Sequence, residues 1–354
     1  MGWLLLESYY DGSHRHLVDG LRQHVCPDAE LWTLPGRKWK WRMRGAALDF
    51  ARRFALEQPD VDGIFVTSLT NAAELRGLLA RQGSKLPIAV YFHENQLAYP
   101  IQHFDQRDHH FAWTNLHSAL VADRLAFNSR FNLDSFLQGM ELVIRKMPDA
   151  RPDWVLEDIK ERAEILPVPI DVARCESVRE GPCHIVWNHR REFDKGGESL
   201  LDAAEALAGS GLDFRFSMLG QEFDTCPSVF GQVAERLGPR LVQNGFVDSR
   251  EEYWRILSSA DVALSTARHE FQGLAVLEAC AAGATPLVPD ALAYRELFPE
   301  EWRYRNDSDL CDRLVDRVKD VEMWRATDPR PVALPFTWPE LASKWARFLG
   351  PADA

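Results

Sequence analysis

The sequence has no apolar run long enough to cross a membrane and no excess of positive charge. Its 354 residues contain no stretch of about 18 consecutive apolar side chains, the length that indicates a membrane-spanning helix. Lysine and arginine number 41 against 53 aspartates and glutamates, so the formal net charge is −12. This balance argues against a protein that binds nucleic acid over its whole surface. A polyanionic partner would have to be bound by a local patch.

Cysteine and histidine are present but lack the spacing of a metal site or a redox motif. The six cysteines are scattered and form no C-x-x-C pair, which favours reduced thiols in a cytoplasmic protein. None of the eleven histidines stands at a familiar ligand spacing from a cysteine or carboxylate, so we expect no structural zinc ion. The opening residues, MGWLLLESYYDGSH, lack the basic flank and cleavage site of a signal peptide, and we predict a strand there.

Short runs of β-branched and aromatic residues alternate with longer amphipathic runs along the whole chain. Predicted strands lie at 3–8, 30–35, 63–68, 88–94, 124–129, 184–189, 214–220, 241–247, 261–267 and 284–290, and predicted helices of the first half at 14–25, 45–57, 71–83 and 111–123. Such alternation produces βαβ units and parallel sheets covered by helices on both faces. The sequence therefore predicts an α/β fold with two doubly wound, Rossmann-like domains that face each other across a cleft.

The chain length also favours two domains, at roughly 150 residues for each. A proline-rich segment at 146–171 interrupts the alternation. It is predicted to be a linker that ends in a short strand. We therefore expect an N-terminal domain at 1–175 and a C-terminal domain at 176–335. A final amphipathic helix within 336–354 is expected to pack across both domains.

Residues 37–44, RKWKWRMR, concentrate five basic side chains and two tryptophans in this acidic chain. Cations bind phosphate groups and indole rings stack on unpaired bases, so the stretch is a candidate contact for single-stranded nucleic acid. A solvated loop whose aromatic side chains pack under a neighbour would have the same composition. So would a basic stripe that lies on a membrane surface.

Two turns that follow predicted strands carry groups suited to a diphosphate. Gly12 and Ser13 stand where the first strand turns into a helix, and backbone N–H groups at such a turn can hold an oxyanion. Arg190 and Lys195 follow the strand at 184–189. Two cations and the amides at a helix start can neutralise a diphosphate without a metal ion. The structural alternatives are an ordinary glycine turn and a surface loop with an ion pair between Arg191 and Asp194.

Residues 269–290, HEFQGLAVLEACAAGATPLVPD, place two glutamates around a predicted helix start. If the helix begins near Gly273 and Leu274, their amides would face an anion, with Glu270 before the helix and Glu278 two turns inside it. A carboxylate in an apolar helix is costly unless it is hydrogen-bonded. Sugar hydroxyls are suitable donors, and a glutamate bonded to the backbone is the alternative.

These motifs resemble a known family. The two glutamates, together with Arg190 and Lys195, resemble the retaining glycosyltransferases of family 4, which have the GT-B fold. Seven segments resemble, in the same order, the tRNA-queuosine α-mannosyltransferase family: ESYYDGSHRHLVDGL, LPGRKWKWRMR, YFHENQLAYP, FNSRFNLDSFL, MPDARP, NHRREFDK and ADVALSTARHEFQGLAVLEA. The resemblance implies a retaining transferase that moves a hexose, with mannose from GDP-mannose expected, onto queuosine in the tRNA anticodon loop. Another hexose would use the same residues.

The resemblance also implies a role for each domain and for the donor-site residues. The N-terminal domain would bind the acceptor, and the C-terminal domain would bind the nucleotide sugar. Arg190 and Lys195 would bind the donor diphosphate. The amides of Gly12-Ser13 and Gly273-Leu274 would support them, and Glu278 would hold the donor ribose.

Two residues would act at the reacting sugar, and three would meet the acceptor. By resemblance, Glu270 would contact the 3- and 4-hydroxyls of the sugar, and His93 would face the reacting centre, where a polar group stabilises developing charge. Glu94, Asn95 and Gln96 would contact the acceptor. The resemblance also implies front-face attack with the departing β-phosphate as base, and no side chain stands out as a nucleophile.

If the acceptor is an anticodon base, the basic stretch acquires a function. Its cations would contact the tRNA backbone and its indoles would stack on splayed bases; the residues are Arg37, Lys38, Trp39, Lys40, Trp41 and Arg42. Two Asp-x-Asp strings, 60–62 and 307–309, could indicate a metal-dependent transferase, but one precedes a strand and the other is expected in a C-terminal loop. We therefore expect no metal and no bound cofactor, the nucleotide sugar being a co-substrate.

Three other functions are compatible with parts of the sequence. A family 4 transferase with a lipid or polysaccharide acceptor would use the same donor residues. A catalytically silent tRNA-binding protein would not need them, and a GT-B epimerase would need carboxylate motifs that are not matched. We expect a cytoplasmic enzyme whose partners are a nucleotide sugar and queuosine-containing tRNA.

Overall fold

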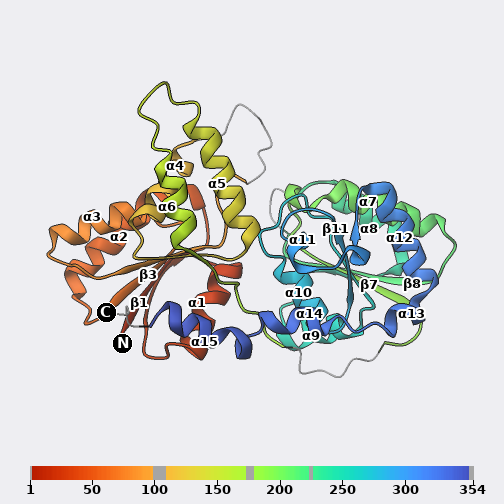
Figure 1. Cartoon of the computed structure of the whole chain (residues 1–354). Helices are drawn as coiled ribbons and strands as arrows, with labels where there is room; N and C mark the ends of the chain where they lie inside the picture. Colours follow the sequence, from red (N-terminus) through yellow and green to blue (C-terminus); the bar gives the residue numbers. More distant parts are fainter. Residues whose placement is uncertain (1, 99–108, 173–178, 223–225, 351–354) are drawn as a thin grey trace. The chain divides into compact units, whose positions relative to one another are not determined.

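The computed structural model describes residues 2–98, 109–172, 179–222 and 226–350 (Figure 1). The chain forms two compact units, of which the first combines Met1–Pro169 with Trp338–Ala354 and the second is Ile170–Thr337. The predicted boundary between 175 and 176, and the last two residues of the motif HENQLAYP, lie outside the described residues. In the described ranges, no helix is long and apolar enough to cross a membrane.

The first unit is built on a parallel six-stranded sheet with the order β2-β1-β3-β4-β5-β6. The strands are β1 (Trp3–Tyr10), β2 (Glu30–Pro35), β3 (Gly63–Thr67), β4 (Ile88–Phe92), β5 (Arg124–Phe127) and β6 (Ala163–Ile165). The helices are α1 (Gly12–His24), α2 (Trp39–Glu57), α3 (Ala72–Arg81), α4 (His109–Val121), α5 (Arg130–Ile144), α6 (Trp154–Arg162) and α15 (Trp338–Phe348). Helices α1 and α15 cover one face of the sheet, and α2, α3 and α4 cover the other (Figure 1). Strands β3 and β4 are therefore buried along their whole length, as in sheets covered on both faces.

The second unit repeats this architecture with the strand order β12-β11-β10-β7-β8-β9. The strands are β7 (Cys183–Asn188), β8 (Phe214–Leu219), β9 (Leu241–Gly245), β10 (Val262–Leu264), β11 (Thr285–Pro289) and β12 (Arg303–Tyr304). The helices are α7 (Gly197–Gly209), α8 (Val229–Leu237), α9 (Arg250–Ser259), α10 (Leu274–Ala281), α11 (Tyr294–Leu297), α12 (Asp307–Lys319), α13 (Val321–Arg325) and α14 (Arg330–Ala333). The two parallel sheets confirm the predicted α/β class with two doubly wound domains.

Two predicted segments differ from the structure. The segment 146–171, predicted to be a linker that ends in a short strand, also contains helix α6 before the edge strand β6. The helix predicted at 45–57 begins six residues earlier, at Trp39, so the basic stretch forms the first turns of α2. In both places tertiary packing stabilises structure that the local pattern does not indicate.

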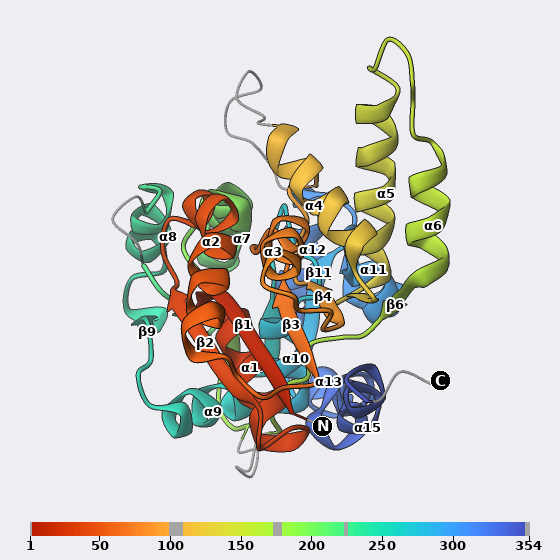
Figure 2. The ribbon, with the colours of Figure 1, turned by 90° about the vertical axis from the view of Figure 1, so that its left-hand side faces the viewer.

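The C-terminal helix α15, expected to pack across both domains, belongs to the first unit. Its Trp338 ring packs against Gly20 of α1 so closely that a Cβ at Gly20 would clash with it. Trp345 is fully buried beside Tyr91 of β4, and its indole N–H donates to the Pro167 carbonyl at 3.1 Å. Figure 2 shows this helix below the strands of the first unit.

Each sheet contains one point at which the chain reverses its direction of travel across the strands. In the first unit it goes from β1 outward to β2, then returns to β3 and continues to β6; in the second it goes from β7 to β8 and β9, then returns to β10. Ligands of open parallel sheets bind at the carboxyl ends of the strands at such switch points. The ends of β1, β3 and β4, and those of β7 and β10, are therefore the places to look for a site.

Candidate active site

Lys195 joins the two sequence motifs of the second unit. It follows β7 in a short 3-10 turn, Phe193–Lys195, and is only 7% exposed. Its Nζ donates to the His269 carbonyl at 3.0 Å and lies 3.3 Å from Glu270 Oε2 and 3.2 Å from Asp194 Oδ2. The structure thus brings together Lys195 and Glu270, which are 75 positions apart, at the switch point between β7 and β10.

Glu270 is held as a carboxylate at neutral pH. Burial by itself would raise its pKa, but the Lys195 ammonium, His189 and a hydrogen bond from the Gly273 amide lower the pKa to about 2. Its side chain remains 20% exposed. An ionised, partly accessible carboxylate can accept hydrogen bonds from vicinal sugar hydroxyls.

Gly273 starts helix α10 and requires the conformational freedom of glycine. It has a φ of 76°, in the left-handed region, and an added Cβ would come within 2.7 Å of the Tyr294 ring. Tyr294 is fixed in turn by a 2.8 Å hydrogen bond between its hydroxyl and Ser265 Oγ. The glycine therefore lets the chain turn sharply after Glu270, so that α10 begins at Leu274.

Glu278, two turns into α10, is bound by side chains of the same unit. The Tyr253 hydroxyl donates to its Oε2 at 2.7 Å, and Arg250 pairs with its Oε1 at 2.9 Å and with Asp171 at 2.8 Å. These contacts satisfy a carboxylate whose side chain is only 14% exposed. Its role toward a ribose stays a prediction.

Arg190 and its neighbour Arg191 have different environments. The Arg190 side chain is 48% exposed and pairs with Glu192 at 3.1 Å. Arg191 is buried and bonds to Glu222 and Asn244. The ion pair considered between Arg191 and Asp194 is not among these contacts, because Asp194 pairs with Lys195. Arg191 fixes the loop after β7, and Arg190 stays accessible.

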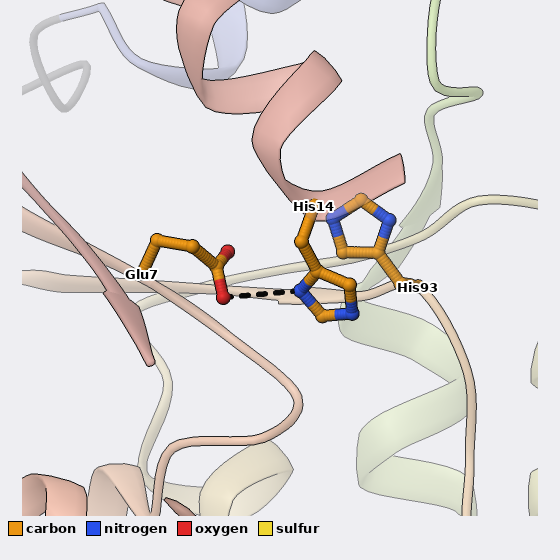
Figure 3. Close-up of side chains that lie close together, drawn as sticks. All are labelled: Glu7, His14 and His93. Atoms are coloured by element: carbon orange, nitrogen blue, oxygen red, sulfur yellow. Dashed lines mark hydrogen bonds and ion pairs between the residues drawn. The ribbon is translucent and has the colours of Figure 1, made fainter. Parts of the chain in front are cut away.

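A second polar cluster lies in the first unit, at the ends of β1, β3 and β4. The ring of His14, in the first turn of α1, stands between two carboxylates, with Nδ1 at 3.1 Å from Glu7 Oε1 and Nε2 at 3.2 Å from Glu94 Oε2. Figure 3 shows the Glu7 contact and the neighbouring His93 ring. Burial opposes protonation of His14, but Glu7 and Glu94 raise its pKa to about 10. His14 is therefore an imidazolium at neutral pH.

Neighbouring hydroxyls and amides fix both carboxylates. Thr67 Oγ1 donates to Glu7 Oε1 at 3.1 Å and the Tyr9 amide donates to the same oxygen at 2.8 Å. Ser68 Oγ donates to Glu94 Oε1 at 2.9 Å. The other oxygen of Glu7, Oε2, is buried and has no hydrogen-bond partner among the described residues.

His93 follows β4 directly and stacks on His14. The ring centroids are 4.0 Å apart and the planes differ by 29°. His93 is 4% exposed, and within the described residues neither ring nitrogen has a hydrogen-bond partner. Burial, followed by the charges of His14 and His16, lowers its pKa well below the usual range. A neutral His93 offers one N–H donor and one lone pair to a ligand.

Glu7, His14 and His93 each have a possible ligand atom within 4.8 Å of the others. Their geometry is nevertheless that of an ion pair. Both nitrogens of His14 already face carboxylate oxygens, and stacked rings carry their in-plane lone pairs in nearly parallel planes, which do not converge on one ion. The sequence predicted neither Glu7 nor His14 as a site residue; the available signal was an acidic residue within the apolar run WLLLES.

The other predicted residues near this cluster have mainly structural contacts. Asn95 is fully buried, and its side chain bonds to Asn132, Ser135 and the amides of Leu97 and Ala98. The amide of Gln96 donates to Asn115 at 3.3 Å.

At the start of α1, the exposed Gly12 has a φ of 50°, and its amide donates to Asp11 Oδ1 at 2.8 Å. Ser13, partly buried, follows in the first turn of α1. Acceptor and diphosphate roles for these residues stay predictions.

The basic stretch divides its aromatic residues between the interior and the surface. Trp39 packs on Phe111 with ring centroids 5.1 Å apart, whereas Trp41 is 74% exposed. Arg37, Lys38 and Lys40 are exposed, and the first turn of α2 contains no acidic residue. Arg42 is partly buried and bonds to the Pro35 carbonyl at 3.1 Å. The helix dipole disfavours cations at a helix N-terminus. A bound anion would offset this unfavourable interaction.

The two Asp-x-Asp strings have structural contacts. Asp62 accepts from the Gly2 amide at 2.7 Å. The second string was expected in a loop, but Asp307 and Asp309 lie in the first turn of α12, where acidic residues favour the helix dipole. Asp309 also pairs with Arg313 at 2.8 Å.

Solved structures of glycosyltransferases share this fold over almost the entire chain. HepE from Anabaena in complex with UDP-glucose has a TM-score of 0.71 at 13% identity, covering 99% of each chain. Sucrose-phosphate synthase from Thermosynechococcus elongatus has a TM-score of 0.73 at 16% identity, covering 99% of this chain and 98% of that one. With two Rossmann-like units, the chain has the GT-B fold.

Sequence comparison then gives the family. Residues 3–170 match the family model described as tRNA-queuosine alpha-mannosyltransferase N-terminal. The chain is 35% identical over 335 residues to the tRNA-queuosine alpha-mannosyltransferase of Drosophila melanogaster, covering 91% of this chain and 88% of that protein. It therefore belongs to the tRNA-queuosine alpha-mannosyltransferase family, as its motifs predicted.

A more distant similarity covers half of the chain. A GDP-mannose-dependent alpha-(1-6)-phosphatidylinositol dimannoside mannosyltransferase of Mycobacterium tuberculosis is 29% identical over 196 residues, which are 50% of this chain and 48% of that protein.

Proposed function

We propose that this protein transfers mannose from GDP-mannose to queuosine in the anticodon loop of tRNA, with retention of the anomeric configuration. The observation that carries the acceptor and the sugar is the 35% identity to the Drosophila queuosine mannosyltransferase over 91% of the chain. The mycobacterial relative, whose name specifies GDP-mannose, supports the donor.

The Lys195–Glu270 pair supports the donor site. The Lys195 ammonium and the Glu270 carboxylate form an ion pair at 3.3 Å. A bound nucleotide sugar would exchange these partners, with Lys195 turning to the diphosphate and Glu270 to the sugar hydroxyls. Arg190, accessible on the same loop, would add a second cation, and Glu278 would accept from the ribose.

The proposed reaction needs no protein nucleophile. The bond between the sugar C1 and the β-phosphate oxygen breaks, and its electron pair leaves with the phosphate. The acceptor hydroxyl attacks C1 from the same face, and its proton passes to the leaving phosphate oxygen. The cations and the amides at the start of α10 stabilise the negative charge that develops, so we expect no divalent metal. His93, neutral and unpaired within the described residues, would hydrogen-bond the reacting sugar.

The exposed start of α2 supports RNA as the acceptor. The exposed cations Arg37, Lys38 and Lys40 precede Trp41 in the sequence, and the side chain of Trp41 is 74% exposed. A phosphate would neutralise the cations and interact favourably with the helix N-terminus. An unpaired anticodon base could stack on the indole.

The test is mass spectrometry of nucleosides after incubation of the protein with queuosine-containing tRNA and separate nucleotide sugars. We expect queuosine to gain the mass of one hexose with GDP-mannose and to gain none with UDP-glucose or UDP-galactose. A gain with another donor would correct the sugar. If the protein binds GDP-mannose but modifies no nucleoside, a lipid or glycan acceptor replaces tRNA.

A further inference from the structure

The cluster around His14 in the first unit contains more hydrogen-bonding capacity than its own contacts use. Among the described residues, the fully buried Glu7 Oε2 has no hydrogen-bond partner, and neither ring nitrogen of His93 has one. A buried polar atom without a partner is destabilising, so a ligand that supplies N–H and O–H donors would be bound favourably here. An anion would be repelled by the two carboxylates.

Glu94 is the member of the cluster that reaches solvent. Its side chain is 17% exposed, against 6% for His14 and none for Glu7. His14 and Ser68 donate to its two oxygens and hold the carboxylate in one orientation. Its solvent-exposed part can receive a charge-assisted hydrogen bond from an ammonium group.

The cluster adjoins the basic start of α2 through a chain of side-chain contacts. The Tyr9 ring meets the His14 ring edge-on, with centroids 5.8 Å apart. Tyr9 and Trp39 pack against the same apolar group, formed by Met43, Leu69 and Phe111. Trp39 is the first residue of α2. An acidic cluster thus lies next to a basic surface, an arrangement suited to a nucleotide with an anionic phosphate and a cationic base substituent.

We propose, on the basis of the proposed function, that Glu94 recognises the protonated amine of the queuosine side chain, with His14 as its positioning residue. The queuosine side chain joins a dihydroxycyclopentene ring to 7-deazaguanine through a secondary amine, which carries a positive charge near neutral pH. The ammonium would pair with Glu94, and the hydroxyls would lie near the unpaired His93 nitrogens. Recognition of this charge would distinguish queuosine from the guanine of an unmodified anticodon.

Two tRNAs that cannot accept the sugar test the effect of the positive charge alone. The first carries 7-aminomethyl-7-deazaguanine in the anticodon, and its aminomethyl group is cationic. The second carries the 7-cyano base, whose substituent is uncharged. Both lack the acceptor hydroxyls. Both tRNAs are used as competitive ligands. The tRNA with the aminomethyl base should bind the wild-type protein about tenfold more tightly than the tRNA with the cyano base. Glu94→Gln should reduce this preference to about twofold or less, whereas the exposed Glu30→Gln should leave it unchanged.

Equal binding of the two tRNAs by the wild-type protein would overturn the assignment, and this result does not depend on the folding of any variant. An unchanged tenfold preference in Glu94→Gln would overturn it as well. The preference should persist in EDTA; its loss there would assign the cluster to a metal ion. Mannose transfer to queuosine, measured separately, tests the proposed function, so that a failure of either idea can be recognised.

Discussion

Replacing His14 by glutamine should remove a pH-dependent contribution to the stability of the first unit. The ring of His14 is buried between the carboxylates of Glu7 and Glu94. Glutamine retains a hydrogen-bond donor for one carboxylate but carries no charge. The substitution therefore tests the ion pairing separately from most of the packing.

The size of the effect follows from the pKa of His14. The two carboxylates outweigh the effect of burial and raise the pKa from 6.5 to about 10. At about 1.4 kcal/mol per pH unit, this difference corresponds to roughly 4–5 kcal/mol of stability. Because the folded-state pKa is the higher one, the contribution is fully present below pH 6.5 and is lost as the pH rises toward 10.

Urea unfolding of the wild-type protein and His14→Gln, at several pH values between 6 and 10, measures this difference. We expect the gap in unfolding free energy to be largest near pH 6 and to shrink by about 1.4 kcal/mol per pH unit. The exposed His117→Gln serves as the matched control and should change stability by less than about 0.5 kcal/mol. A gap between wild type and His14→Gln that stays constant over this range would refute the charged state of His14.

Three further substitutions test other parts of the account. Lys195→Ala should weaken GDP-mannose binding by at least about a hundredfold, since it removes a cation from the diphosphate site. Calorimetry measures the affinity, with the exposed Lys319→Ala as control. Equal affinity of Lys195→Ala and the wild-type protein would contradict the role of Lys195 at the diphosphate. Replacing Arg37, Lys38 and Lys40 together by alanine should reduce tRNA affinity. It should also lower the magnitude of the slope of log association constant against log salt concentration by about two. An unchanged slope would show that these side chains do not contact tRNA phosphates. Gly273→Ala should lower the unfolding free energy by about 1–3 kcal/mol because of its positive φ, and an unchanged melting temperature would contradict the predicted strain.

The sequence predicted the strands that have apolar runs and missed the shortest one, β12. This strand comprises two residues at a sheet edge, where pairing with a neighbour determines the conformation more than side-chain pattern does. The start of α2 was missed for a similar reason. Lys38, before the helix, has a left-handed conformation and provides no side-chain cap, so no capping residue marks the helix start.

The candidate site was predictable where its residues follow strands in recognisable motifs. Lys195 and Glu270 lie after β7 and β10, which are neighbours in the sheet, and the parallel topology brings them together. Glu7 and His14 escaped prediction because their role depends on Glu94, 80 positions beyond His14. A glutamate in an apolar strand and a histidine at a helix start do not reveal from the sequence alone that they form one ion-paired cluster.

The central claim is that queuosine in tRNA accepts mannose. The most direct measurement is the transfer of radiolabelled mannose from GDP-mannose to two preparations of bacterial tRNA, one from a strain that makes queuosine and one from a strain that cannot. We expect label in the first tRNA, none in the second, and loss of the label with Lys195→Ala. Equal labelling of both preparations, or of neither by protein that binds GDP-mannose, would contradict it.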